Sequence, residues 1–315
     1  MNEQPAVVLM ILTSHRLDCL RLCMDCLFAS RALPRLRRVV FLLNGVRGRQ
    51  LAYVRRTVQE HPEVRWDTIS GPRGRGRLIS GLQNECVRRY PGTIYIKLDE
   101  DTFVCRDWLD RMLAAYAARA ADPDLALITP VIPNSGLGLY HLLDVLPDLA
   151  AEYQDRFRFP RTDAFDAPVW KYPRVAEWAI RRTIDMEQTN RRLRQVVSEP
   201  YREFAARFNI NCILYDYRHW REIGGVPEHD EIGWGEWTPA HGKHHVVIRD
   251  TVVQHYSFFV QQDWLDRSTL LEDLRRANLP QTLARPGLVS YHLPRGIRIA
   301  RQVPRIIRRR LLPES

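Results

Sequence analysis

Two aspartates separated by one residue could bind a metal ion. Asp99 and Asp101 lie in TIYIKLDEDTFV (93–104), whose β-branched and aromatic residues predict a strand. Because side chains alternate along a strand, the two aspartates face one way and Glu100 faces the other. Two carboxylates on one side suit a hard divalent ion, whose octahedral shell a nucleotide diphosphate and water would complete. The residues alone also allow a solvated acidic turn after a strand.

Three cysteines near the N-terminus have the spacing that radical-SAM enzymes use for an iron–sulfur cluster. Cys19, Cys23 and Cys26 form the pattern C-x3-C-x2-C. Apolar residues recur at three- and four-residue steps over 17–28, which predicts an amphipathic helix. On that helix the thiols form one row about 10 Å long, whereas the ligands of a cubane cluster converge on one small object. We therefore favour packing of the cysteines, and a cluster would need an unwound segment.

The composition is that of a globular chain with excess positive charge. Its 315 residues are 45% hydrophobic and 27% charged, which suffices for one large domain or two modest ones. Lys and Arg outnumber Asp and Glu by 47 to 37, a net charge of +10, so we expect an anionic partner: a phosphate-bearing ligand, a nucleic acid or an acidic membrane surface. No segment approaches the ~20 apolar residues that span a bilayer, and MNEQPAVVLMILTSHR lacks a signal-peptide cleavage site, so we expect a cytoplasmic protein.

Strand and helix patterns alternate along the first part of the chain, which predicts a parallel α/β sheet. Strands are predicted at 6–14, 37–45, 63–70, 93–104, 126–133, 209–216 and 245–257. Helices are predicted at 17–28, 51–61, 78–89, after a cap at Asp107, and at 175–197. Residues 134–205 contain no strong strand pattern and are interpreted as a helical insertion.

Six segments in chain order resemble a GT-A glycosyltransferase, and they are most similar to family 2. They are LTSHRLDCLRLCMDCL, FLLNG, GRGRLISGLQNE, YIKLDED, NINCILYDYRHWREIGGVPE and GWGEW. The resemblance covers most of residues 6–260, with 134–205 outside it. It implies an α/β fold with a Rossmann-like, mostly parallel sheet flanked by helices, here with a helical insertion and a basic C-terminal tail.

The resemblance also implies an activity and an organisation of the chain. Residues 1–133 would bind the nucleotide sugar, 134–205 would form a helical insertion near the acceptor, 206–262 would complete the catalytic core, and 263–315 would be a helical basic extension. The expected reaction is metal-dependent transfer of a hexose, with inversion favoured, from a nucleoside-diphosphate sugar to a hydroxyl of a glycan or glycolipid. A UDP-sugar is the favoured donor, and the expected cofactor is Mn²⁺ or Mg²⁺.

The nucleoside, by this resemblance, contacts the turn after the first strand and the end of the second strand. These contacts would come from Thr13, Ser14, His15, Arg16 and Asn44. Relatives usually have Asp where this chain has Asn44, whose amide can still hydrogen-bond a base or a ribose.

The resemblance assigns metal and ribose contacts to the acidic triplet. Asp101, matching the last Asp of DxD, would bind the metal, and Asp99 would hold ribose, metal-bound water or the metal itself. His255 in VVQHYS falls where many relatives place a further metal ligand, although a lone strand histidine can also be structural.

A glycine-rich loop, GPRGRGR (71–77), carries Arg73, Arg75 and Arg77. If this loop crosses the strand ends, the planar guanidinium groups would pair with diphosphate oxygens. The three arginines could equally be solvated loop charges.

The acceptor hydroxyl needs a base within hydrogen-bond reach, opposite the departing diphosphate. The resemblance places this base in HDEIGWGEWTPAHG, where relatives have Glu-Asp and this chain has Glu236-Trp237. Glu236 is the first candidate and Asp230 and Glu231 are the alternatives, while a sugar-binding or helix N-terminal role for Glu236 stays open. Trp234 and Trp237 could stack on a sugar or pack in the core.

The end of the chain, LPRGIRIARQVPRIIRRRLLP, is basic and periodic. Arg298, Arg301, Arg305 and Arg309 oppose an apolar face, which predicts an amphipathic helix interrupted at Pro304. Such a helix could hold the protein peripherally on the inner, anionic face of a membrane beside a lipid-linked acceptor, or it could pack on the core.

Two other functions compete with a glycosyltransferase, and a zinc site is considered separately. A nucleic-acid-binding module would use the +10 charge, but the arginines are not interleaved with an RNA-binding aromatic signature or a DNA-binding motif, so no nucleic acid is expected. A radical-SAM enzyme would use the three cysteines, but Asp25 stands where an aromatic residue is usual. Zinc at His241, His244 and His245 is disfavoured because that group lacks a cysteine or carboxylate partner.

Overall fold

The computed structural model describes residues 6–164, 166–204, 208–256, 258 and 260–280. The strands are β1 (Val7–Thr13), β2 (Arg38–Asn44), β3 (Trp66–Gly71), β4 (Ile94–Asp99), β5 (Thr102–Phe103), β6 (Leu125–Val131), β7 (Tyr201–Phe204), β8 (Cys212–Asp216), β9 (His244–Val252) and β10 (Gln254–His255). The α-helices are α1 (Leu17–Ala29), α2 (Gly48–Glu60), α3 (Arg77–Arg89), α4 (Trp108–Arg119), α5 (Gly136–Val145), α6 (Pro147–Phe157), α7 (Pro168–Lys171), α8 (Pro173–Arg182), α9 (Met186–Val196), α10 (Tyr217–Glu222), α11 (Asp230–Ala240), α12 (Gln262–Leu265) and α13 (Leu270–Asn278), with a 3-10 turn, η1, at Leu33–Arg35.

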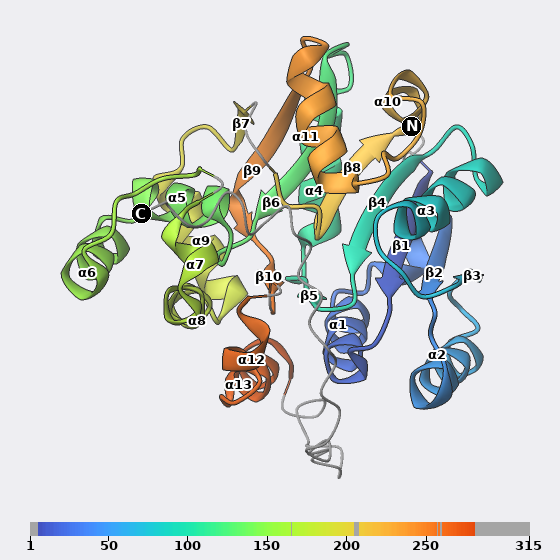
Figure 1. Cartoon of the computed structure of the whole chain (residues 1–315), viewed down its shortest axis with the longest axis horizontal. Helices are drawn as coiled ribbons and strands as arrows, with labels where there is room; N and C mark the ends of the chain where they lie inside the picture. The colour runs from blue at the N-terminus through green and yellow to red at the C-terminus, as the bar shows by residue number, and fades with distance from the viewer. Residues whose placement is uncertain (1–5, 165, 205–207, 257, 259, 281–315) are drawn as a thin grey trace, which may run out of the picture. The chain divides into compact units, whose positions relative to one another are not determined.

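Among the described residues, eight strands form one mixed sheet in the order β3-β2-β1-β4-β8-β6-β9-β7 (Figure 1). β1 pairs in parallel with β2 and β4, β2 pairs in parallel with β3, and β6 pairs in parallel with β9. β8 is antiparallel to both β4 and β6, so β4 and β6 point the same way. The predicted mostly parallel α/β sheet is therefore confirmed. The strands β1, β2, β4 and β6 all end on one side of the sheet. We call this row of strand ends the carboxyl edge and the row of their starts the amino edge; neither term refers to an edge strand.

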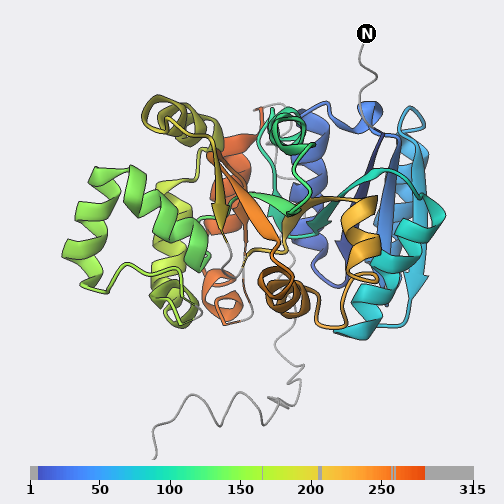
Figure 2. The same ribbon diagram turned by 90° about the horizontal axis from the view of Figure 1, so that it is seen from above.

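Helices cover both faces of this sheet (Figure 2). In β1, Val7, Leu9 and Ile11 pack in the core layer that contains α1 and α4, whereas Val8 and Met10 pack in the layer that contains α3. A continuous apolar run is typical of a strand buried on both faces. Each such side chain contributes roughly 1.5–3 kcal/mol when fully buried, so the two layers hold the strand ends that carry the polar residues.

The three N-terminal cysteines lie on one unbroken helix. α1 runs through Cys19, Cys23 and Cys26, which are 0%, 0% and 3% exposed and belong to the hydrophobic core. Burial raises the pKa of the Cys26 thiol to about 12 and raises the pKa of the other two thiols well above the usual range. This buried environment favours the neutral thiol, whereas a metal ligand must be a thiolate. The packing interpretation is confirmed.

The block 134–205 is helical, as predicted, but the structure corrects two details. The expected single helix at 175–197 is wrong, because α8 ends at Arg182 and α9 begins at Met186. Between them the Asp185 carboxylate accepts a hydrogen bond of 2.8 Å from the backbone N–H of Gln188, which caps a new helix. The block also contains the strand β7, which pairs with β9 and which has two charged residues among its four.

The helix expected after Asp107 begins there, but the Asp107 side chain does not cap it. Asp107 stands at the N-cap position of α4, but its side chain makes no capping hydrogen bond. Its Oδ2 accepts instead from Arg194 at 2.6 Å and from Arg111 at 3.3 Å. Two guanidinium groups therefore hold this carboxylate away from the backbone N–H groups of the helix start.

The last described helices pack against α1 and the turn before it. Arg275 of α13 lies 2.5 Å from Asp25 of α1, and Asp266 lies 2.9 Å from the Arg16 guanidinium. The chain divides into two units after Ala284, so α12 and α13 belong to the first unit. The predicted tail helix with its four arginines falls outside the described residues. No helix in the described ranges is both long and apolar enough to cross a bilayer.

Candidate functional site

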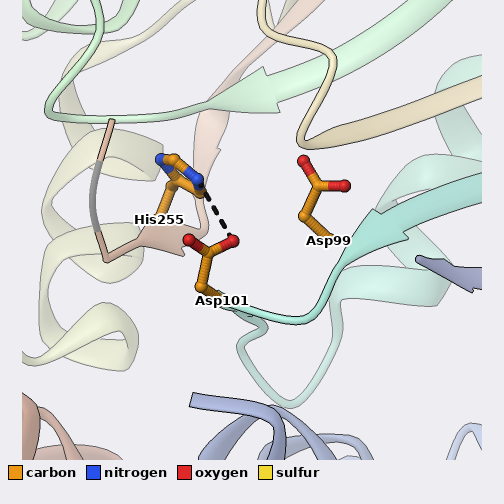
Figure 3. Close-up of side chains that lie close together, drawn as sticks. All are labelled: Asp99, Asp101 and His255. Carbon is orange, nitrogen blue, oxygen red and sulfur yellow. Dashed lines mark ion pairs between the residues drawn. The ribbon is translucent and has the colours of Figure 1, made fainter. Parts of the chain in front are cut away.

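The acidic triplet lies at the carboxyl edge of the sheet. Asp99 is the last residue of β4, and Asp101 follows it before β5. β5 pairs with β10 in the register that puts His255 opposite Thr102. Figure 3 shows the His255 ring facing the Asp101 carboxylate, with the Asp99 carboxylate beside them. The fold thus brings His255 next to two aspartates that lie more than 150 positions earlier in the sequence.

These three side chains present a convergent set of donor atoms. His255 Nε2 lies 3.3 Å from Asp101 Oδ1, and one donor atom from each of Asp99, Asp101 and His255 lies within 4.8 Å of the other two. Two carboxylate oxygens and one imidazole nitrogen suit Mg²⁺ or Mn²⁺. The residues present therefore fit a divalent ion.

Asp99 is held on both of its oxygens. The Lys97 ammonium lies 2.6 Å from Asp99 Oδ1, and the Asn211 amide donates to Asp99 Oδ2 at 2.8 Å. Lys97 is 1% exposed and also donates to the Ile210 carbonyl at 2.9 Å. Burial raises the pKa of Asp99 above its ordinary value, the Asp101 charge adds to this rise, and the Lys97 charge opposes it. The orientation of Asp99 is therefore set by the protein before any ligand binds.

Asp101 is kept in its charged form. Burial tends to raise the pKa of Asp101, but the His255 ring and the Arg16 guanidinium outweigh that effect, so the pKa lies below its ordinary value. The backbone N–H of Tyr256 donates to the Asp101 carbonyl at 2.8 Å, which ties the β4–β5 turn to β10. A carboxylate that binds a metal must be deprotonated, and the lowered pKa of Asp101 favours that form.

Lys97 and Asn211 were not identified from the sequence. Lys97 stands two residues before Asp99 on β4, and alternation along a strand puts both side chains on one face, so a signal was present. Asn211 reaches Asp99 only because β8 pairs with β4 in an antiparallel register. Its amide nitrogen also lies 3.1 Å from His255 Nε2, so it links two of the predicted ligands. No local sequence pattern predicts that strand pairing.

The predicted nucleoside turn at 13–16 lies beside the triplet, with its side chains divided between two environments. Thr13 is buried, and its hydroxyl bonds to Glu100. The Arg16 guanidinium pairs with Asp18 and Asp266, at 2.8 and 2.9 Å, and is mostly buried. Ser14 is partly exposed, and the His15 side chain is 50% exposed. A ligand would therefore meet this turn through Ser14 and His15.

Asn44 clamps the arginine-bearing loop. Its amide nitrogen donates to the Gly74 carbonyl at 2.9 Å, and its amide oxygen accepts from the Gly74 N–H at 2.8 Å. Gly45, at φ +68°, packs so closely under the loop that a Cβ there would lie 2.2 Å from the Arg73 Cβ. An aspartate at position 44 could accept from Gly74 but could not donate to it. This pairing gives a physical reason for the amide at this position.

The three loop arginines project from the clamped loop. Arg73, Arg75 and Arg77 are exposed; the first two lie between the end of β3 and the start of α3, and Arg77 is the first residue of α3. The end of β3 belongs to the carboxyl edge, since β3 is parallel to β2. The structure therefore brings the arginines to the same edge as the acidic triplet.

The predicted acceptor residues lie along α11. Its first turn carries Asp230 and Glu231, and Asp230 Oδ2 accepts from Gln83 of α3 at 3.2 Å. The loop before α11 contacts the start of α3, where the Ser80 hydroxyl donates to the Pro227 and Glu228 carbonyls. α11 leads into β9, whose first residue pairs with the first residue of β6 at the amino edge (Figure 1). Asp230 and Glu231 are therefore nearer the carboxyl edge than Glu236, which is exposed farther along the helix.

The two tryptophans of α11 differ in their surroundings. Trp234 is 0% exposed and packs against Tyr215, with ring centroids 5.0 Å apart. Trp237 stacks on His241 at 4.2 Å. Of the two alternatives, packing in the core describes Trp234.

His241, His244 and His245 do not form one group. His241 stacks on Trp237, and His245 is buried with its Nε2 3.0 Å from the Thr238 hydroxyl. His244 joins a different cluster, in which its Nε2 lies 2.9 Å from Asp122 and 4.0 Å from Glu203.

Three solved glycosyltransferase structures are similar to this chain to different degrees. One of them is the mannosyltransferase PcManGT from Pyrobaculum calidifontis in complex with GDP-Man and Mn²⁺. The match covers 87% of this chain and 64% of the mannosyltransferase chain, with a TM-score of 0.52 and 15% identity. The match to GalNAc-T7 with UDP, GalNAc and Mn²⁺ covers 88% of this chain and 48% of GalNAc-T7, with a TM-score of 0.49 and 13% identity. S. aureus TarS 1-349 in complex with UDP-GlcNAc matches 40% and 34% with a TM-score of 0.32 and 10% identity. No protein-family model and no curated protein sequence matches the chain. The likeness to the mannosyltransferase confirms the predicted GT-A fold.

Proposed function

We propose that this GT-A chain is a metal-dependent glycosyltransferase that moves a sugar from a nucleoside diphosphate to an acceptor hydroxyl. The observation that carries the proposal is the convergence of Asp99, Asp101 and His255 within 4.8 Å at the carboxyl edge. Sheets of this kind bind ligands outside the carboxyl ends of their strands. The similar mannosyltransferase was solved in complex with GDP-Man and Mn²⁺, which supports both the donor class and the ion.

Asp101 and His255 would hold the Mn²⁺ or Mg²⁺ ion. Asp99, whose oxygens already accept from Lys97 and Asn211, would accept further hydrogen bonds from ribose or from water on the ion, or would complete the ligand set. When bound, the ion supplies positive charge that stabilises the departing diphosphate. Lys97 offsets the charge of Asp99 and leaves Asp101 as the carboxylate with a depressed pKa.

The donor would lie between two features of the carboxyl edge. Ser14 and His15 on one side would contact the nucleoside. On the other side, the loop clamped by Asn44 would present Arg73, Arg75 and Arg77 to the diphosphate, because guanidinium groups form paired hydrogen bonds with phosphate oxygens. A UDP-sugar or a GDP-sugar fits this chemistry equally, so both belong in the test.

The acceptor base would be Asp230 or Glu231 in the first turn of α11, with Glu236 as the further candidate. A base must reach the acceptor hydroxyl opposite the departing diphosphate, and the first turn lies nearer the carboxyl edge. D230N, E231Q and E236Q each remove proton acceptance and keep side-chain size. The variant that lacks the base should lose roughly 10²–10⁴-fold in turnover with its nucleotide affinity retained. Turnover retained in all three variants would contradict a base on α11.

The acceptor we propose is a hydroxyl of a glycan or of a lipid-linked glycan. The helices α5 to α9 would bound the acceptor side, and the basic tail would add attraction to an anionic membrane surface. A chain ending near residue 280, compared with the full chain in sedimentation with anionic and neutral vesicles, tests the membrane part. Equal sedimentation of both proteins would contradict it.

The proposed function is tested with a panel of UDP- and GDP-sugars. Thermal unfolding and sugar release are measured with Mn²⁺, with Mg²⁺ and with excess chelator. We expect one sugar nucleotide to raise the unfolding temperature and to be hydrolysed slowly, both only with the ion present. Equal behaviour in chelator, or no response to any sugar nucleotide, would overturn the proposal.

A further inference from the structure

We propose that Glu100, the middle residue of the acidic triplet, is a positioning residue that fastens the turn at residues 13–16 to the end of β4. The triplet directs its outer carboxylates toward the metal cluster and its middle carboxylate toward the turn. The inference rests on the proposed function, because it assigns Glu100 the task of holding the nucleotide-binding turn at a set distance from the metal ligands. Nothing in the DxD pattern specifies the residue at this middle position.

Four donors meet on the Glu100 carboxylate. Its Oε1 accepts from the backbone N–H groups of His15 and Arg16, at 2.9 and 3.0 Å. Its Oε2 accepts from the Thr13 hydroxyl at 2.5 Å and from the Gln50 amide at 2.6 Å. The donors belong to β1, to the turn after it and to α2, so one side chain joins three segments to β4.

The position requires an acceptor with two equivalent oxygens. Glu100 is 5% exposed, and water does not replace lost partners easily at such a site. An ionised carboxylate accepts on both oxygens and donates nothing, whereas an amide accepts on one end and donates on the other. Hydrogen bonds to an ionised acceptor are also shorter and stronger than neutral ones. With glutamine here, two of the four donors would face an N–H group.

The contacts continue on both sides of Glu100. Its own backbone N–H donates to the Leu12 carbonyl at 3.0 Å, which extends the β1–β4 pairing by one residue. On the far side of the turn, the Arg16 guanidinium is anchored by Asp18 and Asp266. The turn is therefore held at both ends, and only its exposed middle, Ser14 and His15, is left for a ligand.

The first test measures binding rather than turnover. Titration calorimetry compares the affinity of wild type, E100Q and the exposed control E85Q for UDP and for GDP, each with saturating Mn²⁺. We expect E100Q to bind the nucleotide about tenfold more weakly, with Mn²⁺ affinity within about twofold of wild type, and E85Q to be unchanged. Unchanged nucleotide affinity in folded E100Q would overturn the inference. Failure of wild type to bind either nucleotide would overturn the proposed function and the inference with it.

A second variant separates positioning from general stability. Q50E combined with E100Q exchanges the amide and the carboxylate, so a carboxylate on α2 can accept from Thr13 and from the amide that replaces Glu100. The remaining amide oxygen can then serve His15 and Arg16. We expect this double variant to recover most of the lost affinity, and hydrogen exchange at the 15 and 16 amides to be faster in E100Q and restored in the double variant. Weaker binding in both with no change in that exchange would contradict positioning through the turn.

Q50A provides the test if E100Q does not fold. It removes one of the four donors and leaves the carboxylate in place. We expect nucleotide affinity to fall by about two- to threefold, with exchange at the 15 and 16 amides increased. Wild-type affinity and wild-type exchange in Q50A would overturn the inference.

Discussion

Two clusters in this chain have the same kinds of donor atom, and they lie at opposite edges of one sheet. The first, which we call the site cluster, is Asp99, Asp101 and His255; the second, which we call the edge cluster, is Asp122, Glu203 and His244. His244 is the first residue of β9 and pairs with the first residue of β6, which places the edge cluster at the amino edge. Each cluster brings its three donor atoms within 4.8 Å, so donor type and spacing do not distinguish them.

The clusters differ in burial and in which cation they already contain. His255 is 3% exposed, and Asp99 is held by Lys97 and Asn211. In the edge cluster the Glu203 side chain is 49% exposed, and Arg119 donates to it at 2.7 Å. Arg119 thus neutralises Glu203 much as Lys97 neutralises Asp99, and the clearer difference is that His255 is buried whereas Glu203 is half exposed. We expect the supporting residues, as well as the ligands, to decide whether such a group binds a metal.

The largest expected effect separates the two clusters by activity. D101N should lower turnover by roughly a thousandfold or more, because the proposed leaving-group stabilisation depends on this carboxylate. D122N, the matched change at the edge cluster, should leave turnover within about twofold of wild type, because Asp122 lies at the amino edge, away from the proposed ion, and asparagine keeps an oxygen that can accept from the Asp124 N–H. Initial rates with the donor identified by the panel measure both. Loss of activity in D122N would break the distinction.

Two buried histidines outside both clusters sharpen the comparison through pH. Burial lowers the pKa of His219 to about 4 and that of His141 to about 4, with Asp216 and Glu222 opposing only part of the effect at His219. Both rings must stay neutral in the folded protein, whereas an unfolded histidine titrates near pH ~6.5. The neutral rings therefore contribute fully to the free energy of unfolding above pH ~6.5. This contribution, up to ~3 kcal/mol for each histidine, is lost as the pH falls through about 4. Denaturant unfolding at several pH values measures the loss.

H219F tests that assignment. It keeps an aromatic ring and removes the titration, so the free energy of unfolding should fall less between pH 6.5 and pH 4 than in wild type, by as much as ~3 kcal/mol. The exposed control H229Q should follow the wild-type pH dependence. An equally steep loss in H219F would show that acid sensitivity arises elsewhere.

Removing one histidine from each cluster compares their ion affinities. H255Q should weaken Mn²⁺ binding by about 10–100-fold, at least as much as losing a supporting residue costs. H244Q should leave Mn²⁺ affinity unchanged, because the proposed ion does not bind at the edge cluster. Calorimetric titration with Mn²⁺ and circular dichroism of both variants provide the measurement and the folding control. Equal weakening by the two changes would remove the difference between the clusters.

The smallest expected effect comes from Arg119. R119M should cost at most ~1 kcal/mol of unfolding free energy, as for other partly exposed ion pairs. It also releases the Glu203 carboxylate, so a second, weak Mn²⁺ binding event should appear at millimolar ion. R35M, which removes a comparable surface pair with Asp110, should keep the wild-type stoichiometry. A second ion in wild type, or none in R119M, would contradict the role given to Arg119.

The fold could be predicted largely because its elements have strong local patterns. The apolar run that became β1 and the helical row of cysteines on α1 needed no long-range information. The break between α8 and α9 was missed although Asp185 is a common capping residue, because the apolar periodicity continues across it. The antiparallel direction of β8 could not be derived, since it depends on pairing between β4 and a segment more than a hundred residues later.

Only part of the candidate site could be predicted, because its other residues meet through long-range pairing and not through a local pattern. Asp99 and Asp101 were identified as a pair on one predicted strand over 93–104, although β4 ends at Asp99 and Asp101 lies in the turn after it. His255 was suggested by resemblance. The partners that hold them come from loop and strand pairings: Asn211 across β4–β8, and Gly74 against Asn44. Glu100 was placed on the opposite face correctly, but its four donors could not be foreseen because they meet only in the folded chain.

The most direct test of the central claim is an anomalous difference map from crystals grown or soaked with Mn²⁺ and UDP or GDP. We expect one strong manganese peak between Asp101 and His255 at the carboxyl edge, with the nucleotide diphosphate beside it. We expect no peak at Asp122, Glu203 and His244. A peak only at the edge cluster, or none at the site cluster in crystals that contain the nucleotide, would contradict the account.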